Sequence, residues 1–167
     1  RRPESNWMAL GRWGFRFHAS AIFGAIGLMY LLIFSHRYEF QYIGKHLNDA
    51  MHTQLALASV WGCQEGGVLL WMFWRLLPAI LFLRRLPVKL EAPVMAVHGG
   101  VLTALSSMLL GLYFGEFQFG MDPFLLLRQA PENVGMPWTF NPDYLALIPQ
   151  FADGQGLNPL LQNYWMV

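Results

Sequence analysis

The sequence is poor in charged residues and in cysteine. Charged residues make up 13% of the chain, against about a quarter in soluble domains, and the net charge of +1 gives no positive excess for nucleic-acid binding. The single cysteine, Cys63, excludes an intrachain disulfide and a CxxC pair. Its place in an apolar run favours a small buried filler over a redox residue. Because 55% of the residues are hydrophobic, the composition indicates a membrane protein.

Three apolar runs are long enough to cross a bilayer, which takes about 20 helical residues. They cover residues 15–35, 55–83 and 92–114. The first and third are rich in glycine, alanine and serine, which allow close helix contact, and Pro78 predicts a kink near the end of the second. The sequence therefore predicts an all-α, polytopic membrane helix bundle with three spans, with the transmembrane helices inside residues 1–114.

The stretch 115–167 has a different character, because X-Pro pairs recur along it and bias the preceding residue toward extended or turn geometry. We expect an irregular Pro/Gly-rich external loop with short helices, leading to a further, truncated helix. The chain begins at Arg1 and ends on an apolar-aromatic run, so we interpret it as a piece of a longer protein.

Basic residues predict the orientation. They precede the first run and fill the link between the second and third, whereas the loop 36–54 and the tail carry few. The positive-inside rule then places the amino-terminal end of this multi-pass protein in the cytoplasm and residues 36–54 and 115–167 outside, which is the periplasm in a Gram-negative cell.

The segment WGCQEGGVLLWMFW at 61–74 places Gln64 and Glu65 inside the second apolar run. A carboxylate near a bilayer centre costs about 2.5–3.5 kcal/mol. We expect Glu65 to lie about 15 Å from the outer end of its helix. Two interpretations stay open: the pair fastens neighbouring helices, or it lines a ligand cleft together with Trp61 and Trp71.

The five histidines show no spacing typical of a closed metal site, so no metal ligand is predicted. Three of them, His36, His46 and His52, share one loop, where a cofactor contact stays open. His98 lies inside the third run, and we interpret it as a satisfied packing histidine rather than an axial ligand.

Four blocks together resemble the CcmF-type cytochrome c haem lyase family. They are HRYEFQYI at 36–43 followed by His46, Trp61 followed by QEG at 64–66, DPF at 122–124, and DGQGLNPLLQ at 153–162. The chain departs from the family pattern in having Gly67 where serine is usual. It also has neither the family's WWD segment nor its His-Pro-Pro, and none of the family's haem b histidines maps onto it.

The resemblance implies cytochrome c biogenesis: a membrane haem lyase subunit that accepts haem and presents it for covalent attachment to apocytochrome c. Its implied partners are apocytochrome c, a haem carrier or chaperone, other maturation subunits and the lipid bilayer, with haem as the cofactor of the full-length protein. No catalytic residue is assigned. The candidate haem-cleft wall is Trp61, Gln64, Glu65 and Trp71, and the candidate loop residues are Asn158 and Gln162.

Two other classes of protein stay open. In a proton- or solute-translocating transporter subunit, Glu65 would be an intramembrane proton site. Such transporters more often show paired acids or matching broken helices in two repeats, and the sequence has no internal repeat. The other class is a structural assembly subunit.

Overall fold

The computed structural model describes residues 3–114, 117–147 and 153–156. The chain forms two compact units, each taken by itself below. Unit 1 comprises Arg1–Gly27 and Val68–Met121, and unit 2 comprises Leu28–Gly67 and Asp122–Val167.

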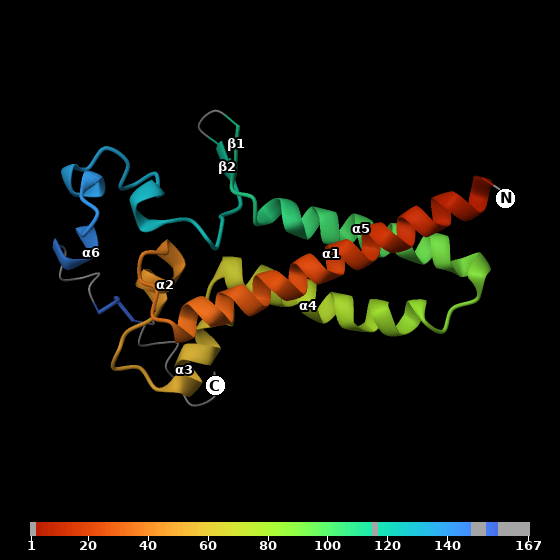
Figure 1. Cartoon of the computed structure of the whole chain (residues 1–167), viewed down its shortest axis with the longest axis horizontal. Helices are drawn as coiled ribbons and strands as arrows, with labels where there is room; N and C mark the ends of the chain where they lie inside the picture. The colour runs from red at the N-terminus through yellow and green to blue at the C-terminus, as the bar shows by residue number, and fades with distance from the viewer. Residues whose placement is uncertain (1–2, 115–116, 148–152, 157–167) are drawn as a thin grey trace. The chain divides into compact units, whose positions relative to one another are not determined.

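Three long helices dominate the chain: α1 (Pro3–Phe34), α4 (Gln64–Leu83) and α5 (Val88–Met108). Their parts in unit 1 lie side by side (Figure 1). The segments Asn6–Phe34, Gln64–Leu83 and Val88–Met108 are long and apolar enough to cross a membrane. The predicted all-α bundle with three spans is therefore confirmed.

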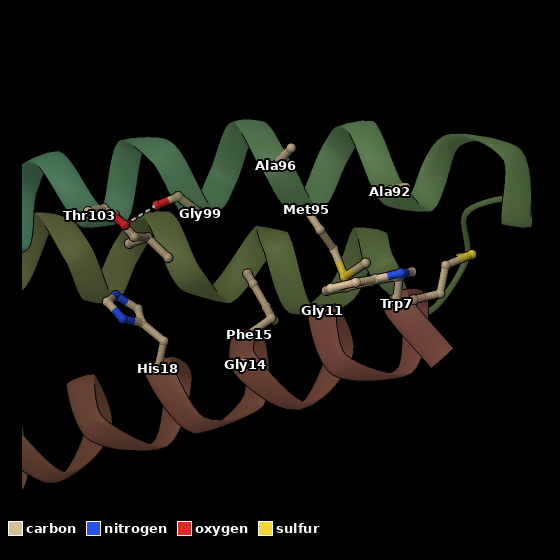
Figure 2. Close-up of a pocket in the computed structure, with 12 residues that line it drawn as sticks. Trp7, Gly11, Gly14, Phe15, His18, Ala92, Met95, Ala96, Gly99 and Thr103 are labelled. Atoms are coloured by element: carbon tan, nitrogen blue, oxygen red, sulfur yellow. Dashed lines mark hydrogen bonds between the residues drawn. The ribbon is translucent and has the colours of Figure 1, made fainter. Parts of the chain in front are cut away.

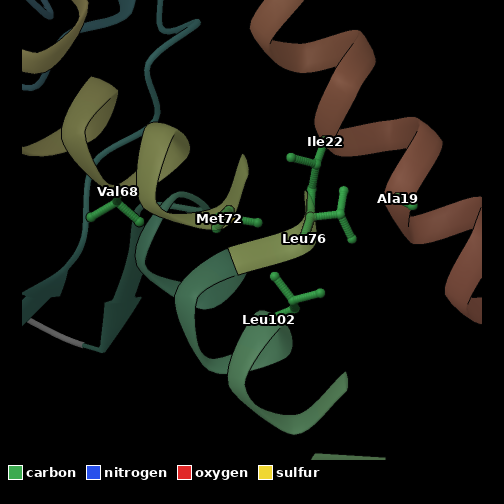
Figure 3. Packing of buried hydrophobic residues seen from close by; sticks show 6 residues of the cluster. All are labelled: Ala19, Ile22, Val68, Met72, Leu76 and Leu102. Atoms are coloured by element: carbon green, nitrogen blue, oxygen red, sulfur yellow. The ribbon is translucent and has the colours of Figure 1, made fainter. Parts of the chain in front are cut away.

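The core of unit 1 draws on all three helices. Its buried cluster combines two residues of α1 and one of α5 with three residues of α4 spaced four apart: Ala19, Ile22, Val68, Met72, Leu76 and Leu102 (Figure 3). That spacing puts the α4 residues on one helix face. Other apolar side chains of these helices point outward, such as Leu81 and Val97, as expected where the solvent is lipid.

The third span ends earlier than the apolar run does. After α5 ends at Met108, a short antiparallel pair follows, with β1 (Leu112–Phe114) paired to β2 (Phe117–Phe119). The Met121 N–H then donates to the Met108 carbonyl at 3.0 Å, which returns the chain to the end of α5.

The second apolar run is not one helix. It divides into α3 (Thr53–Ala58), the 3₁₀ turn η1 (Ser59–Trp61) and α4, which begins at Gln64. The Tyr42 hydroxyl lies 2.8 Å from the Ser59 carbonyl oxygen and 3.1 Å from that of Val60. The Ser59 carbonyl also accepts from the Gly62 N–H at 3.2 Å, which is a 3₁₀ contact and not an α-helical one. Glu65 consequently lies in the first turn of α4, and the prediction that it lies about 15 Å inside its helix is wrong.

Unit 2 is built around the short helix α2 (Gln41–His46). The segment before η2 (Leu127–Gln129) runs alongside its start, since the Gln41 N–H donates to the Leu125 carbonyl and the Leu127 N–H to the Glu39 carbonyl, both at 2.8 Å. Beyond it come only the short turns η3 (Pro137–Phe140) and α6 (Tyr144–Leu147) in the described part of the tail. Unit 2 is therefore irregular in structure, and it buries its own apolar side chains, including Ile43, Leu47 and Leu127.

Candidate functional site

Two of the sequence blocks meet at the carboxyl end of α2. The Gln155 N–H donates to the Gly44 carbonyl at 2.8 Å, and the Gly156 N–H donates to the Leu47 carbonyl at 2.9 Å. The Asn48 side-chain amide adds a hydrogen bond to the Gly154 carbonyl at 3.2 Å. Residues 153–156 are thus attached to a segment more than a hundred positions earlier in the chain.

This attachment requires glycine at position 154. Gly154 has a φ of +76°, in the left-handed region that glycine adopts without steric cost. A Cβ atom there would also overlap the carbonyl oxygen of Leu47. The close approach of the two backbones therefore depends on the absence of a side chain.

A thiol, an imidazole and a phenol gather beside the start of α4. The His46 Nδ1 lies 2.7 Å from the Tyr42 carbonyl oxygen, which can only accept, so Nδ1 carries the proton and Nε2 is free to accept. The Cys63 Sγ lies 2.6 Å from that Nε2. The Tyr42 and His46 rings also contact each other, with centroids 4.7 Å apart.

The electrostatics favour the neutral forms of the thiol and the phenol. Burial raises the pKa of the Cys63 thiol, and the neighbouring Glu65 raises it further. Burial also raises the pKa of Tyr42, with smaller effects from Cys63 and Glu65. Cys63 is therefore a protonated thiol that donates to His46, rather than an activated thiolate nucleophile.

A second polar group fixes the entry to α2. The Tyr38 hydroxyl donates to the Asp49 carboxylate, and the His36 Nδ1 lies 2.9 Å from both groups. Burial raises the pKa of Tyr38, and the hydrogen bond to Asp49 raises it further. His36 itself has a φ of 48°, which is rare for a residue other than glycine. These contacts hold the chain between α1 and α2 in one conformation.

The predicted cleft residues lie in different places. Trp61 is the last residue of η1 and is 42% exposed, Gln64 begins α4 and is exposed, and Glu65 is half-buried beside it. These three lie within five residues of chain, next to the group formed by Tyr42, His46 and Cys63. Trp71 is 69% exposed and belongs to unit 1. Asn158 and Gln162 lie outside the described residues.

Sequence reasoning missed Tyr42 and the pairing of His46 with Cys63. Tyr42 lies inside the block HRYEFQYI at 36–43, but nothing in the sequence shows that its hydroxyl reaches the carbonyls of η1. His46 and Cys63 are 17 positions apart, in segments with no shared period. A close approach of this kind follows from tertiary structure and leaves no local signal.

The membrane helices of unit 1 hold a separate, mostly apolar cavity of about 510 Å³. It lies between α1 and α5, with small residues from both helices on its walls (Figure 2). The ring of His18 reaches toward α5 there, and its Nε2 is buried without a hydrogen-bond partner within the described ranges. The Nδ1 of His98 is likewise buried without a hydrogen-bond partner in the described residues. The interpretation of His98 as a satisfied histidine is therefore wrong.

Metal binding finds no support in the part of the chain that the structure describes, where no group of three or more His, Cys, Asp and Glu side chains is placed to hold an ion. His46 and Cys63 supply two atoms of the kind that bind metals. Glu65 affects Cys63 through its charge.

Three apolar helices and a folded unit rich in loop hydrogen bonds define a multi-pass membrane protein. Comparison with known proteins shows which proteins it resembles. The chain is 31% identical, in an alignment 175 positions long, to the cytochrome c-type biogenesis protein CcmF of Pseudomonas aeruginosa, covering 99% of this chain and 22% of that protein. The CcmF of Pseudomonas fluorescens is 28% identical, covering 96% of this chain and 21% of that protein. The cytochrome c-type biogenesis protein NrfE of Haemophilus influenzae is 26% identical over 86% of this chain and 19% of its own length.

Over most of its length the chain is therefore similar to CcmF-type cytochrome c-type biogenesis proteins, which confirms the resemblance seen in the four sequence blocks. It spans about a fifth of the length of the curated relatives it matches. No family model and no solved structure matches it.

Proposed function

We propose that this chain is part of a membrane haem lyase subunit of cytochrome c biogenesis. The full-length protein would accept haem from a carrier and present it for covalent attachment to the cysteine thiols of apocytochrome c. The observation that carries the proposal is similarity over 99% of the chain to a protein named for cytochrome c-type biogenesis. Haem is the cargo of this reaction, and the chain contributes membrane scaffold and part of the surface that receives it.

The position of the aromatic residues supports this role. Trp61 and Trp71 each present a broad exposed face, which suits stacking on a flat, apolar porphyrin. Gln64 and Glu65 follow Trp61 at the amino-terminal end of α4 and would offer polar contacts at the rim of such a cleft. We keep these four residues, together with Asn158 and Gln162, as the proposed haem-facing set.

The alternative of a proton-translocating subunit loses its main support. It rested on a carboxylate deep in a membrane helix, and Glu65 lies instead in the first turn of α4. A carboxylate at a helix amino terminus is stabilised by the helix dipole and needs no transport role to explain it.

Covalent haem staining of c-type cytochromes tests the proposal directly. Cells that lack the gene for the full-length protein should make and export apocytochrome c but attach no haem to it. Normal staining in such cells would refute the function. Within the restored protein, Trp61→Ala and Trp71→Ala should each reduce staining at unchanged protein abundance.

Trp74 supplies the matched control for these variants. It lies on α4 and is 62% exposed, like the candidates, but stands outside the proposed set. Trp74→Ala should leave staining close to the wild-type level. Equal losses in all three variants would mean that the tryptophans only anchor the helix in the bilayer, and the proposed cleft wall would be withdrawn.

The proposed setting is a bacterial inner membrane, with the amino-terminal end of α1 in the cytoplasm and residues 36–54 and 115–167 in the periplasm. Cysteine labelling with an impermeant reagent in whole cells tests the orientation, after Cys63→Ser removes the native thiol. Lys45→Cys should label from outside and Arg85→Cys should not. The reverse pattern would invert the topology.

A further inference from the structure

A groove of about 710 Å³ lies within unit 1, between the middle of α1, the end of α4 and the start of α5. Its lining combines two kinds of residue. Arginines and a glutamate line one part, and apolar side chains including Ala19, Phe23 and Ile80 line the rest. A groove with one cationic part and one apolar part suits an amphiphile with a negative head.

The charge of one arginine in the groove is already balanced by a carboxylate. Arg12 binds Glu91 with two parallel contacts, from Nε to Oε1 and from a terminal nitrogen to Oε2, both at 2.5 Å. The Glu91 side chain is only 12% exposed, so the pair is fixed between α1 and α5. This bidentate pair neutralises one positive charge and holds one wall of the groove in place.

The other two arginines keep their charge. Arg16 lies one helical turn after Arg12, and Arg84 directly follows the last residue of α4. Within the described ranges neither has a carboxylate at ion-pair distance. The guanidinium of Arg16 lies 5.8 Å from the ring centroid of Trp13, a contact that orients the cation without removing its charge.

The groove lies at the depth of lipid headgroups. From Arg16 to the end of α1 at Phe34 the helix rises about 27 Å at 1.5 Å per residue, close to the roughly 30 Å of a hydrocarbon core. Arg84 stands at the end of a 20-residue span that has about the same length. Both arginines therefore reach the level where phosphate groups of one leaflet are found.

We propose that this groove binds an anionic phospholipid. Its phosphate lies between Arg16 and Arg84, and an acyl chain lies along Ala19, Phe23 and Ile80. Basic pockets between membrane helices bind anionic head groups in this way, because the cations meet the phosphate while the chain covers apolar surface. A soluble anion would satisfy the arginines but leave the apolar part of the groove uncovered. The lipid would tie the three helices together at their basic end.

The test uses the full-length protein, purified in mild detergent and stripped of lipid. Native mass spectrometry then measures binding of phosphatidylglycerol, cardiolipin and zwitterionic phosphatidylcholine, with inorganic phosphate as a separate arm. Phosphatidylglycerol and cardiolipin should bind more tightly than phosphatidylcholine. Arg16→Gln and Arg84→Gln should each weaken binding of the anionic lipids by about fivefold, in line with the contribution of one basic residue near a membrane surface.

Arg85 is the matched control, because it follows Arg84 in the sequence but does not line the groove. Arg85→Gln should leave lipid affinity unchanged, and Arg84→Lys should retain most of it if the glutamine variant fails to fold. Equal binding of phosphatidylcholine would overturn the proposal, as would equal losses at positions 84 and 85. If inorganic phosphate alone raised the melting temperature as much as the lipid did, the groove would be a phosphate site. That result would refute the proposed lipid binding.

Discussion

The backbone N–H of Gly156 donates to the carbonyl oxygen of Leu47 at 2.9 Å, which joins the end of α2 to a segment 109 positions later. Both segments belong to blocks that resemble the CcmF-type family. The structure thus gives a physical reason for the two blocks to occur together: one supplies backbone acceptors, and the other supplies glycines that can approach them.

Gly154→Ala should detach residues 153–156 from α2. Alanine at a φ of +76° is strained by about 1–2 kcal/mol, and its Cβ would also overlap the Leu47 carbonyl. We expect faster hydrogen exchange at the amides of Gln155 and Gly156, which hydrogen exchange followed by mass spectrometry measures.

Gly135→Ala is the control for this variant. Gly135 has a φ of +87°, but a Cβ atom at this position would meet no other atom within 4 Å, so alanine there adds strain without overlap. Its effect on exchange at positions 155 and 156 should be small. If both variants accelerated exchange at these positions equally, destabilisation by backbone strain and not the contact with Leu47 would explain the effect.

Tyr42→Phe should loosen the start of α4. The phenol donates to the carbonyls of Ser59 and Val60, and its loss removes a buried hydrogen bond worth about 0.5–1.5 kcal/mol. A lower melting temperature of the full-length protein in detergent is the expected result. Tyr144→Phe is the control, because that hydroxyl makes only a long contact of 3.4 Å to the Glu39 carbonyl.

The sequence predicted the parts of this fold that depend on length and composition. Three apolar runs led to three spans. The start of α4 was not predictable in this way. It depends on the hydroxyl of Tyr42, which satisfies carbonyls that an uninterrupted helix would have used.

The candidate site was predicted only in part for the same reason. Trp61, Gln64 and Glu65 were identified because polar residues interrupt an apolar run. The contact of His46 with Cys63 and the pairing of Arg12 with Glu91 bring together residues 17 and 79 positions apart. No periodic pattern relates such residues, so only the tertiary structure reveals them.

Acid should weaken the contact between α2 and the segment that follows η2. Lys45 lies 2.7 Å from the Glu132 carboxylate and Gln41 lies 3.0 Å from it, and the hydrogen bond from Lys45 lowers the pKa of Glu132 below its ordinary value of 4.5. A lowered folded-state pKa means that the unfolded state binds the proton more readily. The stabilisation is therefore present above pH 4.5 and is lost as the pH falls through the folded-state pKa.

Hydrogen exchange around Gln41 and Lys45 measures this effect as the pH is lowered, after correction for the intrinsic exchange rate. Glu132→Gln should remove the dependence and give acid-like exchange at neutral pH. Because Glu132 is more than half exposed, the effect should be local and should shrink in high salt. An unchanged pH profile in the variant would show that another group is responsible.

The charge of Glu65 gives the last prediction. Its place in the first turn of α4 is favourable to the helix dipole by about 0.3–1 kcal/mol, so Glu65→Gln should leave protein abundance nearly unchanged. The same carboxylate raises the pKa of Cys63 and stands beside exposed Trp61 and Gln64. If these residues form the rim of a haem cleft, Glu65→Gln should reduce covalent haem staining of c-type cytochromes to less than half.

Two variants separate this role from simple packing. Glu65→Asp keeps the charge and should restore most of the staining, whereas Glu39→Gln, which removes a surface carboxylate paired with Arg37 in the same unit, should have little effect. Packing alone predicts a different order, because glutamine preserves the size of Glu65 and aspartate does not. Wild-type staining in Glu65→Gln at equal abundance would therefore assign Glu65 to helix packing and remove it from the proposed cleft.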